Sequence, residues 1–523
     1  MELSDRLHTI EGGPITARLQ ALSLRLSLLI TNQQTIVLIL PFLIIYTVKW
    51  VMRYLEVRRQ AKGLPTISSF IEFFESSYRQ KLPHIPFVVP VRDYTIDRPW
   101  QKYEKSGYVA INIFGLQIVS TRNGDEHRRH KKIVKPCFNE SIMQSGWDKV
   151  RDAFGVMKLE EGLATSGGGD VRDLKGCMIK LTLYVFGRSG FNIDIPWNIP
   201  ESQAGEEMHF AEALHVLENN MIPELLIQLW ILLWFPARSL RRLGQAQQSF
   251  LAHIKAMYRS KRLELESRGE SDELASQMSS EAEDRLEQGE KGSRVAGLLE
   301  REIIGNICGV FLAGHETTGH TLTFLQAFLA LHPEWQEKLY QEIISVCGDE
   351  PLSYRHMNQL NLCLAACYET IRLREIVMTL PKIATKDTLL PYTRWDDQGN
   401  VSHHQHFVKK GSHVIIDSPA LSLNPFIWED PNTFNPERFI DNGRVSSAID
   451  EFAGFSLGQR QCIGKRFAEV EMVCYVSHLI GEFKIYPIRE RGESDEDLRE
   501  RLLRGREELT LTPGRIGIRL EMR

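Results

Sequence analysis

Two long apolar runs dominate the hydrophobic and polar pattern of the chain. The first, residues 35–52, reads TIVLILPFLIIYTVKWVM and contains one charged residue, Lys49. Its length is close to that needed to cross a bilayer, and no small-residue cleavage site follows it, so it predicts an uncleaved membrane anchor rather than a signal peptide. Basic residues are denser after the run than before it, which puts the bulk of the chain on the cytosolic side. A buried core helix is the alternative.

The second apolar run, residues 303–331, is interrupted by polar side chains near its middle. The interrupting residues are Asn306, His315, Glu316 and His320. Such groups are costly in lipid, and Pro333 follows the run where it can end a helix. We therefore expect a long helix through the centre of a globular core, whose polar groups need partners or a function.

The rest of the pattern predicts several shorter elements in the first third of the chain. Residues 63–65 indicate a hinge after the anchor. Residues 107–120 alternate between apolar and polar positions and predict a pair of strands that turns at residues 114–115. Residues 125–138 predict a basic helix that ends at Pro136.

Two further segments have distinctive patterns. Residues 222–235 are almost wholly apolar but too short for a second crossing, so they predict an interfacial or core helix. Residues 264–294 are highly charged and nearly free of large apolar groups, which predicts a solvated linker or helix surface. From residue 300 onward, long helical patterns alternate with short strands and proline-containing turns.

Composition narrows the class of protein. The chain has 523 residues, is 43% hydrophobic and carries a net charge of −4, a balance that argues against a nucleic-acid-binding protein. Its 8 cysteines are scattered, so they predict reduced residues rather than a disulfide framework. Cys363 and Cys367 lie one helical turn apart, and we expect them to pack in the core rather than to bind a metal.

One cysteine stands in an unusual loop. The stretch FAGFSLGQRQCIG, residues 452–464, holds Cys462 among glycines and close behind Arg460. A disulfide needs a partner cysteine, and zinc sites recruit several Cys or His residues at short spacing. Neither lies nearby, so the loop predicts a site that uses one thiolate. A buried structural cysteine is the alternative.

The loop matches F-x-x-G-x-R-x-C-x-G at every fixed position, and it resembles the haem-binding loop of the cytochrome P-450 superfamily. The matching residues are Phe455, Gly458, Arg460, Cys462 and Gly464. The resemblance implies that Cys462 is the axial thiolate ligand of the iron in haem b (heme b), and that Arg460 contacts a haem propionate. The glycines would let the chain turn tightly under the macrocycle and bring backbone amides to the sulfur.

The resemblance also implies a fold. We expect a mainly α protein with a small β-rich region, preceded by a single N-terminal transmembrane helix. The expected parts are residues 1–34 as a luminal or interfacial segment, 35–52 as the anchor, 53–65 as the hinge, and 66–523 as the haem-thiolate catalytic domain.

The central helix carries a second family motif. AGHETT, residues 313–318, resembles the oxygen-activation motif of the family. The resemblance implies that Gly314 makes room for haem and dioxygen, while Glu316 and Thr317 form an acid–alcohol pair that relays protons. Threonines on apolar helices are more often bonded to their own backbone, which is the structural alternative.

A third constellation is structural. Glu369 and Arg372 lie at i and i+3 and can pair on one helix face. With Arg438 downstream, they resemble the buried Glu–Arg–Arg network that braces the haem loop in the family. Trp428 also falls where the family has a tryptophan.

Cations form a fourth set. His127 and Lys131 lie in the basic helix that aligns with a propionate-binding segment, although the family often has Trp and Arg at these positions. Lys382 replaces a common arginine. A solvated surface is the structural alternative, and a second use is to steer an acidic electron-donor protein, together with Lys465 and Arg466.

The chain departs from the family pattern in two places. The segment after Arg372 reads LREIVMTLPK and lacks a double proline, and residues 421–425, LSLNP, lack the usual His-Arg-Asp. Both departures affect the shape of the pocket more than the chemistry. Apolar residues at Val377, Met378 and Leu380 favour a bulky lipophilic substrate that arrives from the membrane.

The resulting hypothesis is a microsomal haem-thiolate monooxygenase on the endoplasmic reticulum membrane, single-pass, with a cytosolic catalytic domain. Its partners would be NADPH–cytochrome P450 reductase, with cytochrome b5 as an additional candidate, membrane lipid and a lipophilic small molecule. The sequence of residues 313–322, AGHETTGHTL, resembles the same motif in fungal members of the family, many of which act in terpenoid secondary metabolism. This resemblance favours a terpenoid-like substrate. The alternatives are a haem-thiolate isomerase or dehydratase that acts on peroxides without dioxygen, and a membrane-tethered haem sensor.

Overall fold

The computed structural model describes the chain in segments. These are residues 66–69, 110–113, 124–164, 167–191, 193–198, 202, 207–218, 220, 229–234, 237–268, 300–395, 400–446, 452–507 and 510–523. The predicted anchor and hinge, residues 35–52 and 53–65, lie outside the described residues. Within the described segments, no helix combines the length and the apolar character needed to cross a membrane.

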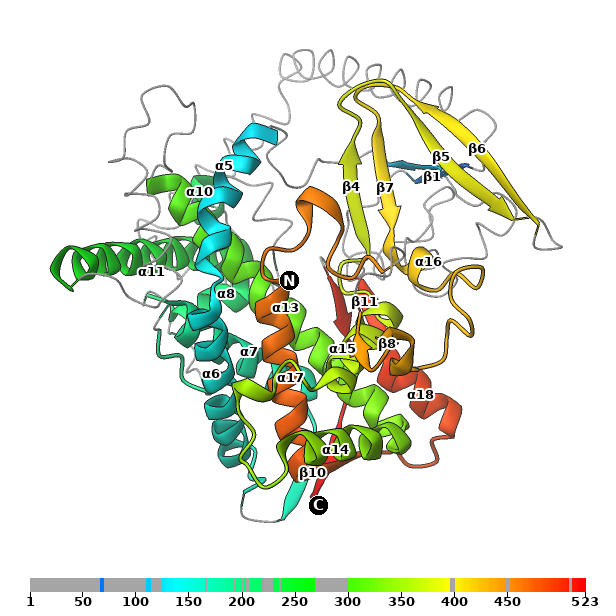
Figure 1. Ribbon diagram of the computed structural model, residues 1–523. Helices are drawn as coiled ribbons and strands as arrows, with labels where there is room; N and C mark the ends of the chain where they lie inside the picture. Colours follow the sequence, from blue (N-terminus) through cyan, green and yellow to red (C-terminus); the bar gives the residue numbers. More distant parts are fainter. Residues whose placement is uncertain are drawn as a thin grey trace, which may run out of the picture.

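Helices form most of the described structure, as expected (Figure 1). The α-helices are α5 (Gly124–Val134), α6 (Glu140–Glu160), α7 (Leu174–Phe191), α8 (Phe210–Glu218), α10 (Leu229–Trp234), α11 (Arg238–Arg268), α13 (Glu300–Leu331), α14 (Pro333–Cys347), α15 (Asn361–Leu373), α16 (Ser418–Ser422), α17 (Lys465–Glu482) and α18 (Asp495–Leu503). Short 3-10 turns are η1 (Lys135–Cys137), η2 (Tyr354–His356), η3 (Pro436–Phe439) and η4 (Gly458–Arg460).

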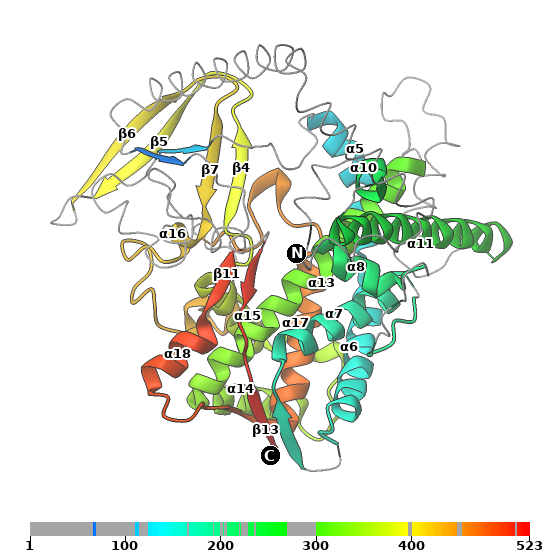
Figure 2. The same ribbon diagram turned by 180° about the vertical axis from the view of Figure 1, so that it is seen from behind.

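The strands between residues 379 and 417 gather on one side of the molecule, and the last strand lies apart from them, beside the C-terminus, as both views show (Figures 1 and 2). The described strands are β1 (Thr66–Ser69), β2 (Ala110–Ile113), β3 (Gly168–Val171), β4 (Thr379–Ile383), β5 (Thr388–Trp395), β6 (Val401–Val408), β7 (His413–Asp417), β8 (Ile440–Asp441), β9 (Arg444–Val445), β10 (Phe483–Pro487), β11 (Gly505–Glu507), β12 (Leu511–Pro513) and β13 (Ile518–Met522). The antiparallel pairs are β4–β7, β5–β6, β8–β9 and β11–β12, and β13 lies between β10 and β3.

The long helix α13 runs through the core. It contacts α7, α15 and α17, and the side chains of Leu322, Leu325 and Leu329 are fully buried. The second half of α13, residues 318–330, is buried on every side, which explains its central place, whereas Gly305, Gly309 and Ala313 are exposed along one face of the first half. Pro333 is the first residue of α14 and marks where α13 stops. The prediction of a buried core helix over residues 303–331 is confirmed.

Aromatic stacking joins α13 to the segment ahead of η3. The rings of Phe328 and Phe434 are stacked with centroids 4.8 Å apart and planes only 5° apart. The edge of Trp335, on α14, meets the same Phe434 ring. This cluster fixes the connection between α16 and η3 against the two helices.

The other predicted elements have mixed outcomes. The basic helix is α5, and Pro136 lies in the 3-10 turn directly after it. Strand β2 occupies the first half of the predicted strand pair, but its partner is the parallel strand β1, and residues 114–120 lie outside the described residues. A sequence pattern shows that a strand exists, whereas its partner depends on distant chain.

The apolar segment and the charged segment are described only at one end. Of residues 222–235, helix α10 is described, and its Leu232 is buried at the contact between α10 and α11. Of residues 264–294, only 264–268 are described, as the end of α11. Cys363 and Cys367 are buried in α15, as predicted.

Candidate active site

The loop that carries Cys462 is a tight turn closed by its own backbone. The amide of Cys462 donates to the carbonyl of Phe455 at 2.8 Å, and the amide of Gln461 donates to the carbonyl of Gly458 at 3.1 Å. Gly458 has φ +72°, a left-handed conformation in which a side chain would be strained. The sequence requirement for glycine at this position therefore follows from the turn.

Backbone amides approach the sulfur of Cys462. Gly464 is the N-cap of α17, and the backbone amides of Gly464 and Lys465 lie close enough to the thiol to act on its pKa. The pKa of the thiol is raised from its ordinary value, mainly because surrounding protein desolvates the thiolate; both amides and the Lys465 charge oppose this shift. The side chain is nevertheless exposed. The loop thus offers one sulfur on an open face, with donors that stabilise its anionic form.

A third glycine of the loop connects it to α15. A Cβ atom added to Gly454 would lie only 2.5 Å from Cγ2 of Ile371 and 2.6 Å from Cζ of Phe452. Only glycine allows this approach without displacement of the neighbours. The loop is therefore packed directly on the helix that carries Glu369 and Arg372.

Glu369 and Arg372 form a fully buried ion pair. Nε and one terminal nitrogen of Arg372 donate to the two carboxylate oxygens of Glu369 at 2.7 and 2.8 Å, and both side chains have 0% exposure. Arg438 adds a longer contact of 3.3 Å to the same carboxylate. The structure thus brings together the three residues of the predicted network.

The remaining donors of Arg372 are satisfied by backbone. One terminal nitrogen donates to the carbonyls of Ser422 and Pro431, each at 2.8 Å. The amide of Asn435 donates to Glu369 at 3.0 Å, and the guanidinium lies 5.0 Å from the ring centroid of Trp428. A buried charge is tolerated when its hydrogen-bonding capacity is filled in this way.

Glu316 and Thr317 on α13 have different hydrogen-bond partners. Thr317 donates to the carbonyl of Ala313, one turn back in the same helix, at 2.9 Å. The carboxylate of Glu316 accepts a hydrogen bond of 3.1 Å from Thr510, which lies far along the chain. The acid is therefore held by tertiary structure, while the alcohol is held by its own helix.

Gly314 has a close neighbour on α7. A Cβ atom added to it would lie 2.8 Å from Cε2 of Phe186 on α7. A Cβ atom at Gly319 would likewise lie 2.9 Å from Cδ1 of Ile179 on α7. The small size of Gly314 lets α7 and α13 pack closely. Its role in making room for haem stays a prediction.

The predicted cations divide into two groups. Lys131 donates to the carbonyl of Gln459 in the cysteine loop at 2.7 Å. The pKa of His127 is lowered by desolvation and then by the nearby charge of Arg460, which puts His127 close to the same loop. Lys382 is exposed on β4, where its backbone pairs with Val414 of β7. Among the described residues, no hydrogen bond or ion pair joins its side chain to the other predicted cations.

The ribbon shows why α5 and β4 both border the site. The orange segment that contains the cysteine loop lies between α5 and the strands β4 and β7 in both views (Figures 1 and 2). Helix α5 and strand β4 therefore lie on opposite sides of this segment.

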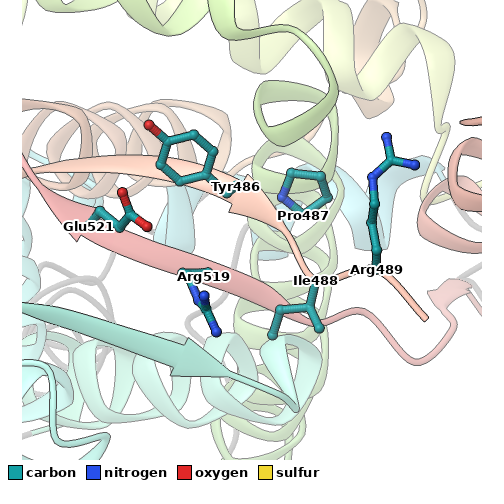
Figure 3. Close-up of a pocket in the computed structure, with 6 residues that line it drawn as sticks. All are labelled: Tyr486, Pro487, Ile488, Arg489, Arg519 and Glu521. Atoms are coloured by element: carbon teal, nitrogen blue, oxygen red, sulfur yellow. The ribbon is translucent and has the colours of Figure 1, made fainter. Parts of the chain in front are cut away.

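A surface depression lies elsewhere. It has a volume of about 370 Å³ and is lined by Tyr486, Pro487, Ile488, Arg489, Arg519 and Glu521 (Figure 3). It adjoins β10, at the far end of α17 from Cys462, and Arg519 there is paired with Asp170 at 2.7 Å. This depression is not the candidate site.

Comparisons with known proteins agree with this geometry. Residues 25–513 match the family model described as Cytochrome P450. The chain is 31% identical over 431 residues to Cytochrome P450 monooxygenase 124 of Postia placenta, which covers 80% of this chain and 78% of the relative. It is 25% identical to Secologanin synthase 1 of Catharanthus roseus over 73% of this chain and 70% of the relative.

A human relative, Cytochrome P450 4F8, is 25% identical over 70% of this chain and 68% of its own length. The chain belongs to the cytochrome P450 family. It is a haem b enzyme of the monooxygenase type, and its mostly helical structure with some strands is the fold of this family.

The residues of this cytochrome P450 fit the cofactor. Haem b needs one thiolate with an open side, and the thiol of Cys462 is exposed, with the amides of Gly464 and Lys465 favouring its ionised form. The propionates of haem need cations or hydrogen-bond donors, and His127 lies close enough to Arg460 of the cysteine loop for the charge of Arg460 to lower its pKa. We propose that Cys462 binds the iron and that Arg460, His127, Lys131 and Lys382 serve the propionates.

The structure of the cytochrome P450 also reveals a buried pair that sequence reasoning missed. Glu375 accepts a hydrogen bond of 3.2 Å from the hydroxyl of Ser422, and the two residues are 3% and 0% exposed. Both stand in the two segments that depart from the family pattern. The signal in the sequence was that both segments depart from the family pattern. Two such segments that touch in the fold can carry residues that pair with each other.

A second buried acid lies on α17. Glu471 is 1% exposed, and its pKa is raised well above the ordinary value because of burial, with an opposing effect from His315 of α13. The signal in the sequence was an acid within the apolar stretch of α17. Glu471 is therefore an acid of α17 that interacts electrostatically with His315, the residue before Glu316.

The Arg372→Ala substitution should destabilise the folded cytochrome P450 by about 3–5 kcal/mol, because it leaves the carboxylate of Glu369 buried without its cation. The free energy of unfolding in urea measures this loss. Arg151→Ala is the matched control, since Arg151 has 51% side-chain exposure and a surface partner in Asp148; it should cost less than about 1 kcal/mol. A loss for Arg372→Ala as small as the control would contradict the bracing role.

Glu375→Gln should change how stability depends on pH. Burial raises the pKa of Glu375 from 4.5 to about 8, so the unfolded state loses this proton at lower pH than the folded state does. The stability contributed by the protonated acid is complete below pH 4.5 and is lost up to about pH 8. As the pH rises through this window, the free energy of unfolding of the glutamine variant should therefore increase relative to that of the wild type by up to about 1.4 kcal/mol per pH unit.

Urea unfolding of both proteins at several pH values within that window measures this difference. Glu437→Gln is the control, because Glu437 has 56% side-chain exposure. Parallel stability curves for wild type and Glu375→Gln would show that the acid is not held protonated in the folded state.

Proposed function

We propose that this cytochrome P450 is a membrane-anchored monooxygenase of the endoplasmic reticulum. It would insert one oxygen atom from dioxygen into a lipophilic substrate, with electrons from NADPH delivered by a reductase. The single observation that carries the proposal is the exposed thiol of Cys462 just before α17, where the amides of Gly464 and Lys465 act to lower its pKa. A sulfur in this environment suits an iron-bound thiolate.

Haem b, when bound to the thiolate, supplies the redox chemistry that cleaves dioxygen and oxidises carbon. The protein's residues orient the reactants and supply protons. In this proposal Glu316 holds a proton on its carboxyl group and passes it along α13, and the hydroxyl of Thr317 is the next donor. The hydroxyl can turn from the Ala313 carbonyl, 2.9 Å away, toward a new acceptor, since this bond is local.

The proposed lipophilic substrate rests on exposed apolar side chains near the site. Val377, before β4, has 41% exposure, and Leu457 in the cysteine loop has 49%. Leu380 is half-buried on β4. Met378, the third residue predicted to favour such a substrate, differs from the other two. It is only 4% exposed and packs with Phe324 and Leu511.

The proposed electron donor is an acidic partner such as NADPH–cytochrome P450 reductase, with cytochrome b5 as a further candidate. The support comes from exposed cations on and after α5, at Arg128, Lys132 and Lys135. Lys465 and Arg466 are weaker candidates for this surface than expected, because both pair with Glu469, at 3.8 and 3.4 Å. A terpenoid-like substrate and a place in secondary metabolism remain part of the proposal through the resemblance of the α13 motif.

The Cys462→Ser substitution should remove the red-shifted band of the reduced carbon monoxide spectrum, because oxygen ligation replaces sulfur ligation. The spectrum is recorded for the purified full-length wild type and for the variant, each reconstituted with haem. Cys474→Ser is a control, since Cys474 is buried and its sulfur lies 3.4 Å from the Trp147 carbonyl. A variant at Cys462 that keeps the thiolate band would refute the assignment of the ligand.

Glu316→Gln should lower product formation by about 100-fold, because a positioned acid contributes at least that factor to proton transfer. The protein is co-expressed with a fungal reductase and supplied with a panel of terpenes, sterols and fatty acids, and product is measured against NADPH consumed. Glu334→Gln, an exposed acid at the start of α14 with 59% side-chain exposure, should leave turnover unchanged. Undiminished product from the Glu316 variant, or turnover without NADPH, would favour a peroxide-rearranging enzyme.

A further inference from the structure

The hairpin of β11 and β12 is held firmly against the core. The amide of Leu511 donates to the carbonyl of Ile376 at 2.9 Å, and the amide of Gly514 donates to the carbonyl of Arg504 at 3.0 Å. The Leu511 side chain packs with Phe324 of α13, Ile376 and Met378. Residue 510, directly before Leu511, is therefore fixed in position relative to α13.

Thr510 uses this position to contact the acid of α13. Its Oγ1 atom donates to Oε1 of Glu316 at 3.1 Å and lies 3.4 Å from Nδ1 of His320. His320 is one turn along α13 from Glu316, and its Nδ1 atom is 3.9 Å from Oε1 of that residue. The three side chains are largely removed from solvent, with 6% exposure for Thr510, 2% for His320 and 14% for the side chain of Glu316.

The protonation states of the three side chains determine which of them donates each hydrogen bond. Desolvation lowers the pKa of His320 to about 3, with smaller effects from Lys175 and His315, so the imidazole is neutral at ordinary pH. A hydroxyl has one proton to donate and can accept in return. When Nδ1 of His320 carries its proton, it donates to Oγ1 of Thr510, and the hydroxyl proton is directed to the carboxylate of Glu316.

We propose that Thr510 is a positioning residue for Glu316, with His320 orienting its hydroxyl, so that the β11–β12 hairpin sets the direction of the acid on α13. This inference rests on the proposed role of Glu316 as proton donor. Glutamate has three side-chain torsions, and a bond from a second, independently anchored element removes much of that freedom. The residue that fixes the acid is thus separated from it by most of the C-terminal half of the chain.

Thr510→Val tests the inference, because valine keeps the shape and removes the hydroxyl. The infrared band of the protonated carboxyl group, assigned to Glu316 by its absence in Glu316→Gln, is followed against pH in the purified holoenzyme. A hydrogen bond to the carboxylate favours the ionised form, so its loss should move the midpoint upward by about one pH unit. Thr510→Ser keeps the donor and should retain the wild-type midpoint.

Thr323→Val is the matched control for the loss of a buried threonine hydroxyl. Thr323 is fully buried on α13 and bonds to the carbonyl of Gly319 at 2.7 Å, so its variant should leave the infrared midpoint unchanged. A midpoint in Thr510→Val that equals the wild-type value would overturn the inference. If Thr510→Val does not fold, Thr510→Ala and His320→Phe in the same titration decide it. The first removes both contacts of the hydroxyl and the second removes the group that orients it, so each should move the midpoint upward.

Turnover separates this inference from the proposed function. With a substrate found in the panel, Thr510→Val should lose product per NADPH about tenfold with little change in KM, and Thr510→Ser should not. If Glu316→Gln keeps full turnover, the proposed proton donor is wrong, while the infrared titration still decides whether Thr510 holds the acid. If Glu316→Gln loses turnover and Thr510→Val changes neither readout, the positioning role alone is refuted.

Discussion

The buried ion pair between Glu369 and Arg372 is the interaction on which the site depends. Two charges are taken fully out of water, and this is tolerable only because every strong donor of the guanidinium finds an acceptor. Those acceptors are backbone carbonyls of the segment that runs from α16 to η3. The pair therefore fixes an irregular stretch of chain that has no sheet or helix of its own to hold it.

The same helix supports the cysteine loop. Ile371, between the two charged residues, is the neighbour that Gly454 of the loop touches. The loop thus rests on a helix whose own position is set by a costly, fully satisfied electrostatic contact. Helix α17, which begins directly after the loop, also contacts α13, so the loop is joined to the core through a second helix. Rigid support from two directions is what a single sulfur ligand needs in order to hold one orientation.

Local features of this site could be predicted from the sequence, because they depend on short spacings. The single-thiol loop at Cys462 and the i, i+3 pair of Glu369 and Arg372 are of this kind, and so is the buried course of α13. The features that could not be predicted depend on which distant segments meet. Phe186 behind Gly314, Ser422 beside Glu375 and Thr510 on Glu316 are contacts across many residues, and no periodicity encodes them.

The bond between the Leu511 amide and the Ile376 carbonyl has a consequence for redesign of the enzyme. The stretch that begins at Ile376 leads to Val377 and Leu380, where a designer would first alter the choice of substrate. Leu511 is adjacent to Thr510, so a shift of that stretch is transmitted to the residue that contacts Glu316. With the roles proposed above for Val377, Leu380 and Glu316, a change in substrate range would therefore also change how efficiently the enzyme uses reducing equivalents.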